Sequence, residues 1–323
     1  MQQVPPRSAV GERGTQVTHS DVRGKVVVIT GATSGIGQTA AETLAGLGTR
    51  IAQIARDRER GEAALKRLQE RGPEAAHAIF YADLSRISEM KRVASEIAAT
   101  EPRIDVLINN AGAIFGQRQL TEDGLELTFA LNHMAYFVVT LGLLERLEAS
   151  APARIVNTAS DAHEVADLDL KDLQSKKAYQ WTFPVWLRYG GPGFTVYGRS
   201  KLFNILFTRE LARRLQGTGV TANSWHPGFV ATRFGAQAGG LIGFGIGVGK
   251  RFARTPEEGA KTLVYLASSP EVANVTGKYF HDQKQVEPSK NAQNDAAAAG
   301  LWQESLKLAA LQESPLLQSS TAC

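Results

Sequence analysis

Two side chains that can move a proton, Tyr197 and Lys201, stand four residues apart in a segment with helical character. On a helix this spacing places them on one face. A free phenol has a pKa of about 10, too high for a base at neutral pH, and a nearby ammonium group lowers that pKa by favouring the phenolate. The pair therefore predicts general acid–base chemistry. Taken alone, the spacing also fits an unrelated, exposed Tyr and Lys.

Two further segments follow predicted strands directly. Ser160 comes just after a predicted strand at 154–158, and open α/β sheets bind ligands at the carboxyl ends of their strands. A hydroxyl there can hold a substrate oxygen as charge develops on it. Asn109, Ala111 and Gly112 follow another predicted strand, which would bring amides and small residues against a ligand. A plain Asn/Gly turn is the alternative.

A glycine-rich segment lies between a β-branched run at 25–30 and a helical pattern that begins near residue 36. Glycine lets the backbone turn sharply and approach a ligand closely, and the free N–H groups of the next helix bind phosphate. The segment therefore predicts a dinucleotide-binding turn, although a turn made only for tight packing is the alternative. The residues expected at the cofactor are Gly31, Thr33, Ser34, Gly35, Ile36 and Gly37.

The residues that end the second predicted strand distinguish the two nicotinamide cofactors. An acid there would accept hydrogen bonds from the ribose hydroxyls of NAD, whereas a base would neutralise the 2′-phosphate of NADP. The chain has Ala55, Arg56 and Asp57 at this place, and a guanidinium group matches phosphate geometry. The sequence therefore predicts NADP(H), held by Arg56. The alternative is that Arg56 is a solvated loop charge and Asp57 binds the ribose.

The elements that must position these residues alternate between apolar runs and helical patterns from residue 25 to about 282. This order is typical of βαβ units. The sequence predicts one α/β domain of Rossmann-like, doubly wound architecture, with a seven-stranded parallel sheet and helices on both faces. The expected strands are 25–30, 50–54, 77–81, 104–108, 154–158, 220–225 and 278–281.

We expect the domain to span 24–312, between a flexible N-terminal arm at 1–23 and a disordered tail at 313–323. A glycine-rich stretch at 233–254 predicts a mobile lid, too short to span a bilayer but able to dip into one. An insert at 161–196 lies between the catalytic segments on the substrate side, where it would wall an apolar pocket or pack on itself. Its aromatic residues are Tyr179, Trp181, Phe183, Trp186, Tyr189 and Phe194.

Composition narrows the partners. The formal charge is +4 over 323 residues, with basic and acidic residues interspersed, which disfavours nucleic acid and suits an anionic cofactor. The one cysteine is Cys323, so no internal disulfide or cysteine-based zinc site is expected, and a reducing compartment is favoured. No apolar stretch precedes residue 25, so we expect a cytoplasmic protein without a transmembrane anchor. His133 and His163 lack further ligands at metal spacing, so no metal is expected.

Four motifs agree in order and spacing with one known family: Thr-Gly-x-x-x-Gly-Ile-Gly at 30–37, Asn-Asn-Ala-Gly at 109–112, Ser160 before Tyr197-x-x-x-Lys201, and Pro227-Gly228. Over residues 24–282 the chain thus resembles the short-chain dehydrogenase/reductase family. The resemblance implies that Tyr197 is the general acid/base, that Ser160 holds the substrate oxygen and that Lys201 binds the nicotinamide ribose. It also implies that Asn132 anchors a proton-relay water. Further implied cofactor contacts are Asp83, Leu84, Asn109, Gly112, Pro227, Gly228, Val230 and Thr232.

Shorter stretches at 154–157, 204–215, 226–228 and 255–260 resemble the retinol dehydrogenase-like branch, which handles lipophilic alcohols and aldehydes. We therefore expect hydride transfer between NADP(H) and a carbonyl or alcohol group of a lipophilic small molecule. A catalytically idle NADP(H)-binding regulator and a reductase of activated C=C bonds are the alternatives. Helical stretches at 132–148 and 200–215 are apolar nearly all round, which predicts a homodimer formed through them.

Overall fold

The computed structural model describes residues 22–180, 191–228, 230 and 254–312. The predicted lid therefore lies outside the described residues except at Arg254. The central part of the insert, most of the N-terminal arm and the C-terminal tail lie outside them as well.

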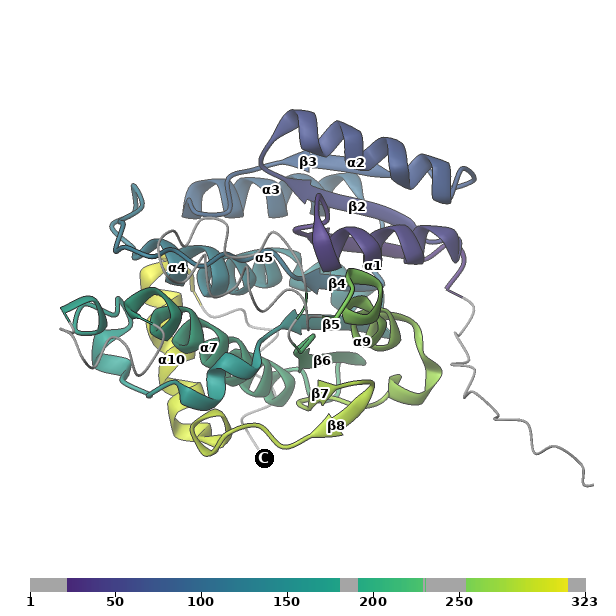
Figure 1. Cartoon of the computed structure of the whole chain (residues 1–323). Coiled ribbons are helices and arrows are strands. Elements are labelled where there is room, and N and C mark those ends of the chain that lie inside the picture. The colour runs from purple at the N-terminus through teal and green to yellow at the C-terminus, as the bar shows by residue number, and fades with distance from the viewer. Residues whose placement is uncertain (1–21, 181–190, 229, 231–253, 313–323) are drawn as a thin grey trace, which may run out of the picture.

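An eight-stranded sheet forms the centre of the described fold, with strand order β3-β2-β1-β4-β5-β6-β7-β8 (Figure 1). All neighbouring strands are parallel except β7 and β8. The doubly wound α/β architecture is confirmed, and each of the seven predicted strands is present. The strands are β1 (Val26–Thr30), β2 (Arg50–Ala55), β3 (Ala78–Tyr81), β4 (Val106–Asn109), β5 (Ala153–Thr158), β6 (Val220–Trp225), β7 (Tyr279–His281) and β8 (Lys284–Val286).

The eighth strand, β8, is absent from the sequence prediction. It is an edge strand of three residues in which Lys284 and Gln285 are exposed, so it has no apolar run. Asp282 and Gln283 connect it to β7 with φ of 48° and 62°. A two-residue hairpin turn of this kind usually carries Asn-Gly or Asp-Gly, so this turn gives no clear signal in the sequence.

Helices cover both faces of the sheet (Figure 1). Because successive side chains of a strand point to opposite faces, Val27 and Ile29 pack toward α1 and α9, whereas Val28 joins the core with α3, α5 and α7. A π-helical turn at Ala130–Met134 joins α4 to α5. The helices are α1 (Gly35–Gly46), α2 (Arg58–Arg71), α3 (Ile87–Thr100), α4 (Leu127–Phe129), α5 (Ala135–Ala149), α7 (Pro192–Arg214), α9 (Pro256–Ser268) and α10 (Asp295–Leu308).

The apolar helices α5 and α7 have partners within the chain. Their lack of a wet face predicts a second copy of the chain, but in the structure α10 packs on α7 and α3 packs on α5. Trp302 of α10 stacks on Phe207 with ring centres 6.0 Å apart, and meets Phe137 at a steep angle at 5.0 Å. These faces therefore do not require a second copy, and the homodimer stays a prediction for sedimentation to test.

Leu127–Ala149 is the one helix within the described ranges that is long and apolar enough to cross a membrane. In its most apolar window, 78% of the residues are buried inside the fold, and α5 packs against α3 and the sheet. We therefore interpret this segment as a core helix.

The parallel register brings the carboxyl ends of the central strands to one edge of the sheet. Ile29 of β1 pairs with Ile108 of β4, Ile108 with Val156 of β5, and Val156 with Asn223 of β6. The segments that follow these strands therefore begin at one level. The chain order reverses between β1 and β4, and open α/β sheets bind their ligands at such a switch point.

Candidate active site

Glycines let the turn after β1 pack tightly against the segment that follows β4. Gly31 and Gly35 have φ of 72° and 57°, in the left-handed region that favours glycine. A Cβ on Gly31 would lie 2.8 Å from the Cα of Ala111, and one on Gly37 would lie 2.3 Å from the Gly31 carbonyl oxygen. The Ser34 side chain makes no capping bond to α1, so the first N–H groups of that helix remain available to an anion.

Sequence reasoning missed two residues, Thr30 and Asn110, that hold this turn. The Thr30 hydroxyl oxygen accepts the N–H groups of Asn110 and Ala111, both at 2.9 Å. The Asn110 side-chain amide donates to the carbonyl oxygens of Thr30 and Gly31 at 3.4 and 3.3 Å. Its oxygen accepts from the Thr158 hydroxyl at 3.3 Å. Thr30 is the first residue of the motif at 30–37, and Asn110 is the second residue of the motif at 109–112. Their places in these motifs were the sequence signal that could have identified them.

The side chain of Asn109 lies in the core of the fold. Its side chain is fully buried and donates to the Thr140 hydroxyl and the Asn157 side-chain oxygen, both at 2.9 Å. Asn157 donates in turn to Thr208 at 3.0 Å. This row of amides and hydroxyls ties β4 and β5 to α5 and α7. Since side chains alternate at the end of a strand, it is Asn110 that reaches the glycine turn.

Three predicted catalytic side chains lie together beyond the carboxyl end of β5. The Tyr197 hydroxyl is within hydrogen-bonding reach of the Ser160 side chain. The ammonium nitrogen of Lys201 lies 5.7 Å from the centre of the Tyr197 ring, and it donates to the Thr158 carbonyl oxygen at 3.0 Å. Tyr197 is 7% exposed and Lys201 is 2% exposed. The group can therefore present a hydroxyl pair to a substrate oxygen beside a buried amine.

Burial changes the electrostatics that the sequence predicts. We expected Lys201 to lower the pKa of Tyr197, but burial raises the pKa of this phenol, with a further rise from the Asp161 carboxylate and an opposing effect from Ser160. Burial also lowers the pKa of Lys201 from 10.5 to about 7. Lys201 therefore carries only part of its charge at neutral pH, and its effect on the phenol is correspondingly smaller.

Asn132 lies within the π-helical turn before α5, and such turns are frequent at functional sites. Its side-chain oxygen accepts the Ala113 N–H at 2.9 Å, and its amide nitrogen donates to the Ser200 hydroxyl at 2.9 Å. A Cβ on Gly112 would lie 3.1 Å from the Asn132 oxygen and 3.4 Å from the Lys201 nitrogen. The backbone of Gly112 thus packs closely on both side chains.

Arg56 follows β2 directly and is exposed. Thr30 pairs with Ile54, so Arg56 lies two residues beyond the level of Thr30, after which the glycine turn begins. It has no ion pair with any residue in the described part of the chain. Asp57, the alternative ribose ligand, caps α2 by accepting the Arg60 N–H at 2.8 Å. The guanidinium group of Arg56 is therefore the less engaged of the two candidates.

Two other implied cofactor contacts follow β3. The Asp83 carboxylate accepts the N–H and the hydroxyl of Ser85 at 3.0 and 2.8 Å, which fixes the turn. Leu84 is buried at 6% exposure. Both residues begin the segment at the same edge of the sheet as the glycine turn.

The last implied contacts follow β6. Pro227 and Gly228 are half-buried, and Gly228 has a φ of 72°. A Cβ on Gly259 of α9 would lie 2.9 Å from the Val230 side chain and 3.3 Å from that of Ile36. Val230 therefore approaches the glycine turn across α9. Thr232 lies outside the described residues.

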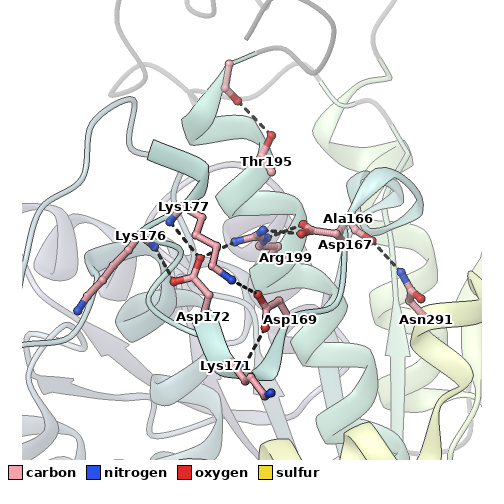
Figure 2. Close-up of polar contacts among 11 residues, drawn as sticks. Ala166, Asp167, Asp169, Lys171, Asp172, Lys176, Lys177, Thr195, Arg199 and Asn291 are labelled. Atoms are coloured by element: carbon pink, nitrogen blue, oxygen red, sulfur yellow. Dashed lines mark hydrogen bonds and ion pairs between the residues drawn. The ribbon is translucent and has the colours of Figure 1, made fainter. Parts of the chain in front are cut away.

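The described part of the insert is anchored on Arg199, which stands in α7 between the two proton-handling residues (Figure 2). Its side chain is 4% exposed, and it donates from Nε and Nη2 to the Asp167 carboxylate at 2.6 and 2.5 Å. Its Nη1 lies 3.6 Å from Asp172. Figure 2 shows both acids converging on this guanidinium group. The insert is thereby fixed to the helix that carries Tyr197 and Lys201.

Two of the insert's aromatic residues are described. Phe194 packs on Tyr197 with ring centres 6.4 Å apart, in a small apolar cluster with Ile114 and Ala162. Tyr179 donates to the Glu126 carboxylate at 3.1 Å. Phe194 therefore lies against the catalytic segment, whereas Tyr179 joins the insert to the loop before α4. The other four lie outside the described residues: Trp181, Phe183, Trp186 and Tyr189.

His133 and His163 make structural contacts. His133 is fully buried, and its Nε2 lies 3.0 Å from the Ser305 hydroxyl of α10. His163 accepts the Ser289 N–H on Nε2 at 3.1 Å, so its Nδ1 carries the proton and donates to the Ser160 carbonyl oxygen at 2.7 Å. The described residues contain no group of three or more His, Cys, Asp or Glu that could hold a metal ion.

Comparison with known proteins agrees with this geometry. The profile of the short chain dehydrogenase family matches residues 25–168 and 187–240. Human retinol dehydrogenase 14 is 41% identical over 300 residues, which cover 87% of this chain and 85% of that protein. The chain therefore belongs to the short chain dehydrogenase family.

Within this family the chain is similar to the retinol dehydrogenases, as its shorter motifs predict. Human retinol dehydrogenase 13 is 38% identical over 93% of this chain and 88% of its own length. Among solved structures, a protein of uncharacterised function from Mycobacterium paratuberculosis is 29% identical with a TM-score of 0.70, covering 91% of this chain and 96% of its own. The family and the oxidoreductase class are thus established.

Proposed function

We propose that this protein transfers a hydride between NADP(H) and a carbonyl or alcohol group of a lipophilic small molecule, with Tyr197 as general acid/base. The observation that carries this proposal is the meeting of half-buried Ser160 with buried Tyr197 and Lys201 beyond β5. The glycine turn after β1 stands at the same edge of the sheet. A dinucleotide bound along that edge would end beside the phenol.

The residues fit such a cofactor. Gly31 and Gly37 let the turn close tightly against Ala111 and on itself, and the first N–H groups of α1 are free for a phosphate. When bound, the nicotinamide supplies or accepts the hydride. Lys201 and the backbone of Gly112 would bind its ribose side, and Arg56 the 2′-phosphate.

This chain's own residues handle the proton. Because burial holds the pKa of Tyr197 above its usual value, the phenol is protonated at neutral pH and can give its proton to a carbonyl oxygen during reduction. The Ser160 hydroxyl donates to the same oxygen as negative charge develops on it. Lys201, with a pKa of about 7, can hold or release a proton near neutral pH, and Asn132 orders the backbone beside it.

The choice of NADP(H) rests on Arg56, and the choice of lipophilic substrates rests on two supports. The retinol dehydrogenases named above are similar over most of the chain. Phe194 and Ile114 also line the side of Tyr197 with apolar surface. A site of this kind favours an apolar substrate body with one polar reacting group.

An NADPH-consumption screen across aldehydes, ketones and enones, with NADH as a control, tests the proposal. We expect turnover of apolar aldehydes or ketones with NADPH, and loss of turnover in Tyr197→Phe by about two to four powers of ten with NADPH binding retained. Unchanged activity in Tyr197→Phe would refute the mechanism. Tight NADPH binding without turnover of any compound would favour the idle regulator.

A further inference from the structure

The residue after Ser160 places a second reactive group at the site. Asp161 begins a short 3-10 turn, and its carboxylate accepts the Ser160 hydroxyl proton at 3.0 Å. The Ser160 oxygen itself accepts the Ala162 N–H at 3.2 Å. The one proton that Ser160 can offer to a substrate is therefore held by Asp161, and a substrate oxygen must take it away.

The Asp161 carboxylate also faces titratable groups from several elements. Its negative charge raises the pKa of Tyr197 on α7 and of Tyr279 on β7. It opposes the lowering of the pKa of His226, which follows β6, and of His163 within its own turn. The Asp161 carboxylate is exposed, and its charge acts on side chains from α7, β7, the segment after β6 and its own turn.

Nothing in the described part of the chain neutralises this charge. No Lys or Arg side chain among the described residues forms an ion pair with Asp161. The carboxylate of Glu164 lies in the same turn, 3.2 Å from His163, and Asp282, which pairs with Arg254, acts together with Asp161 on the pKa of His226. A substrate bound at Ser160 would therefore meet, close to its reacting carbon, a negative charge that no described Lys or Arg side chain pairs with.

We propose that Asp161 is a specificity-determining residue, selecting carbonyl compounds that carry a hydrogen-bond donor beside the carbonyl group and rejecting those that carry a carboxylate there. This inference rests on the proposed function. A substrate oxygen at Ser160 would lie about 3 Å from the hydroxyl oxygen, and the Asp161 oxygen lies at a similar distance from it. A group on the carbon next to the carbonyl can therefore reach Asp161.

The hydrogen bond that Asp161 loses when a substrate binds determines which substrates are favoured. Once the substrate oxygen takes the Ser160 proton, the Asp161 carboxylate needs a new donor. A hydroxyl or ammonium group on the substrate supplies one, whereas a methyl group supplies none and leaves water as the partner. A substrate carboxylate brings like charges together, which costs binding energy even at a partly solvated site.

Three ketones of one alkyl chain test the inference: a methyl ketone, the matching hydroxymethyl ketone and the matching α-keto acid. Benzaldehydes with hydrogen, hydroxymethyl or carboxylate at the ortho position form a parallel series. The values of kcat/KM with NADPH are measured for the wild type, for Asp161→Asn and for Glu164→Gln. Glu164 is a matched control, because it removes one negative charge from the same turn without a contact to Ser160.

We expect the wild type to prefer the hydroxymethyl compound and to turn over the acid least. In Asp161→Asn the ratio of acid to unsubstituted compound should rise by about tenfold or more, mainly through KM, with no change in Glu164→Gln. Alcohol oxidation needs the Tyr197 phenolate, so its rate rises with pH as the phenol loses its proton. Because Asp161→Asn removes a negative charge that raises the pKa of Tyr197, this rise should occur at lower pH in the variant.

The outcomes separate the two claims. If the wild type reduces the unsubstituted compounds but Asp161→Asn leaves all ratios within about twofold, or Glu164→Gln shifts them equally, the specificity role is refuted and the proposed function stands. If the wild type reduces no carbonyl compound in either series, the proposed function fails and the role of Asp161 fails with it.

Discussion

Replacing Lys201 by Met should stabilise the cofactor-free protein while it abolishes turnover. The amine is 2% exposed, and burial lowers its pKa from 10.5 to about 7. The unfolded chain therefore binds a proton more tightly than the folded chain, so the charged amine costs stability at low pH and this cost disappears as pH rises. The difference between the pKa of 10.5 in the unfolded chain and about 7 in the folded chain corresponds to about 5 kcal/mol of unfolding free energy when the amine is charged in both states.

The pH dependence gives this prediction its magnitude. Between pH 6 and pH 9 the folded amine loses its proton while the unfolded amine keeps most of its own, which corresponds to a gain of about 2 to 3 kcal/mol for the wild type relative to Lys201→Met. Tyr197 does not interfere, because its pKa is raised and the phenol stays protonated in both states over most of this range. Lys201→Met should therefore be the more stable protein at pH 6, and its advantage should shrink toward pH 9.

Urea unfolding at pH 6, 7, 8 and 9 measures this difference. Lys66→Met, an exposed lysine on α2, is the matched control and should give a difference from wild type that does not vary with pH. A constant difference between Lys201→Met and wild type across this range would show that the folded amine keeps an ordinary pKa. It would also remove the reason for treating Lys201 as a group that exchanges protons near neutral pH.

Four further substitutions test other parts of the structure. Arg56→Glu should lower the NADPH to NADH ratio of kcat/KM by about two powers of ten, and a constant ratio would contradict a phosphate contact. Gly37→Ala should abolish NADPH binding in a fluorescence titration, because the new Cβ would meet the Gly31 carbonyl oxygen at 2.3 Å. Trp302→Ala should lower the free energy of unfolding in urea by about 3 to 5 kcal/mol. Arg199→Leu should lower it by about 3 kcal/mol, since it leaves the buried Asp172 without its cation; an effect under about 1 kcal/mol would match an exposed pair instead.

The sheet was predictable because its physical signals are local. Each of the seven predicted strands contains buried apolar or β-branched residues, and the βαβ order of such strands allows few topologies. The edge strand β8 has no such run, because Lys284 and Gln285 are exposed and its pairing depends on backbone hydrogen bonds to β7. Pairing between backbones leaves little trace in side-chain identity.

The sequence predicted which residues form the candidate site better than it predicted which way their side chains point. Ser160, Tyr197 and Lys201 meet as their motifs predict, yet the sequence could not show which of two adjacent asparagines turns toward the glycine turn. That choice follows from the pleat at the end of β4, which sends Asn109 into the core and Asn110 to Thr30. Burial raises the pKa of Tyr197, and the spacing of Tyr197 and Lys201 does not show this effect for a similar reason. Spacing shows which charges are near, but burial depends on what the rest of the fold places over them.

The sequence of the apolar helices α5 and α7 likewise does not show which part of the protein packs on them. A helix with no wet face must be covered, and the sequence establishes that need without naming the cover. In the structure α3 packs on α5 and α10 packs on α7. Trp302 of α10 lies between Phe137 and Phe207, and the guanidinium group of Arg214 lies 4.5 Å from its ring centre. A second copy of the chain would have satisfied the same pattern. The helix α10 begins at Asp295, beyond the last strand, so the pattern within α5 and α7 does not reveal it, and the homodimer stays a prediction.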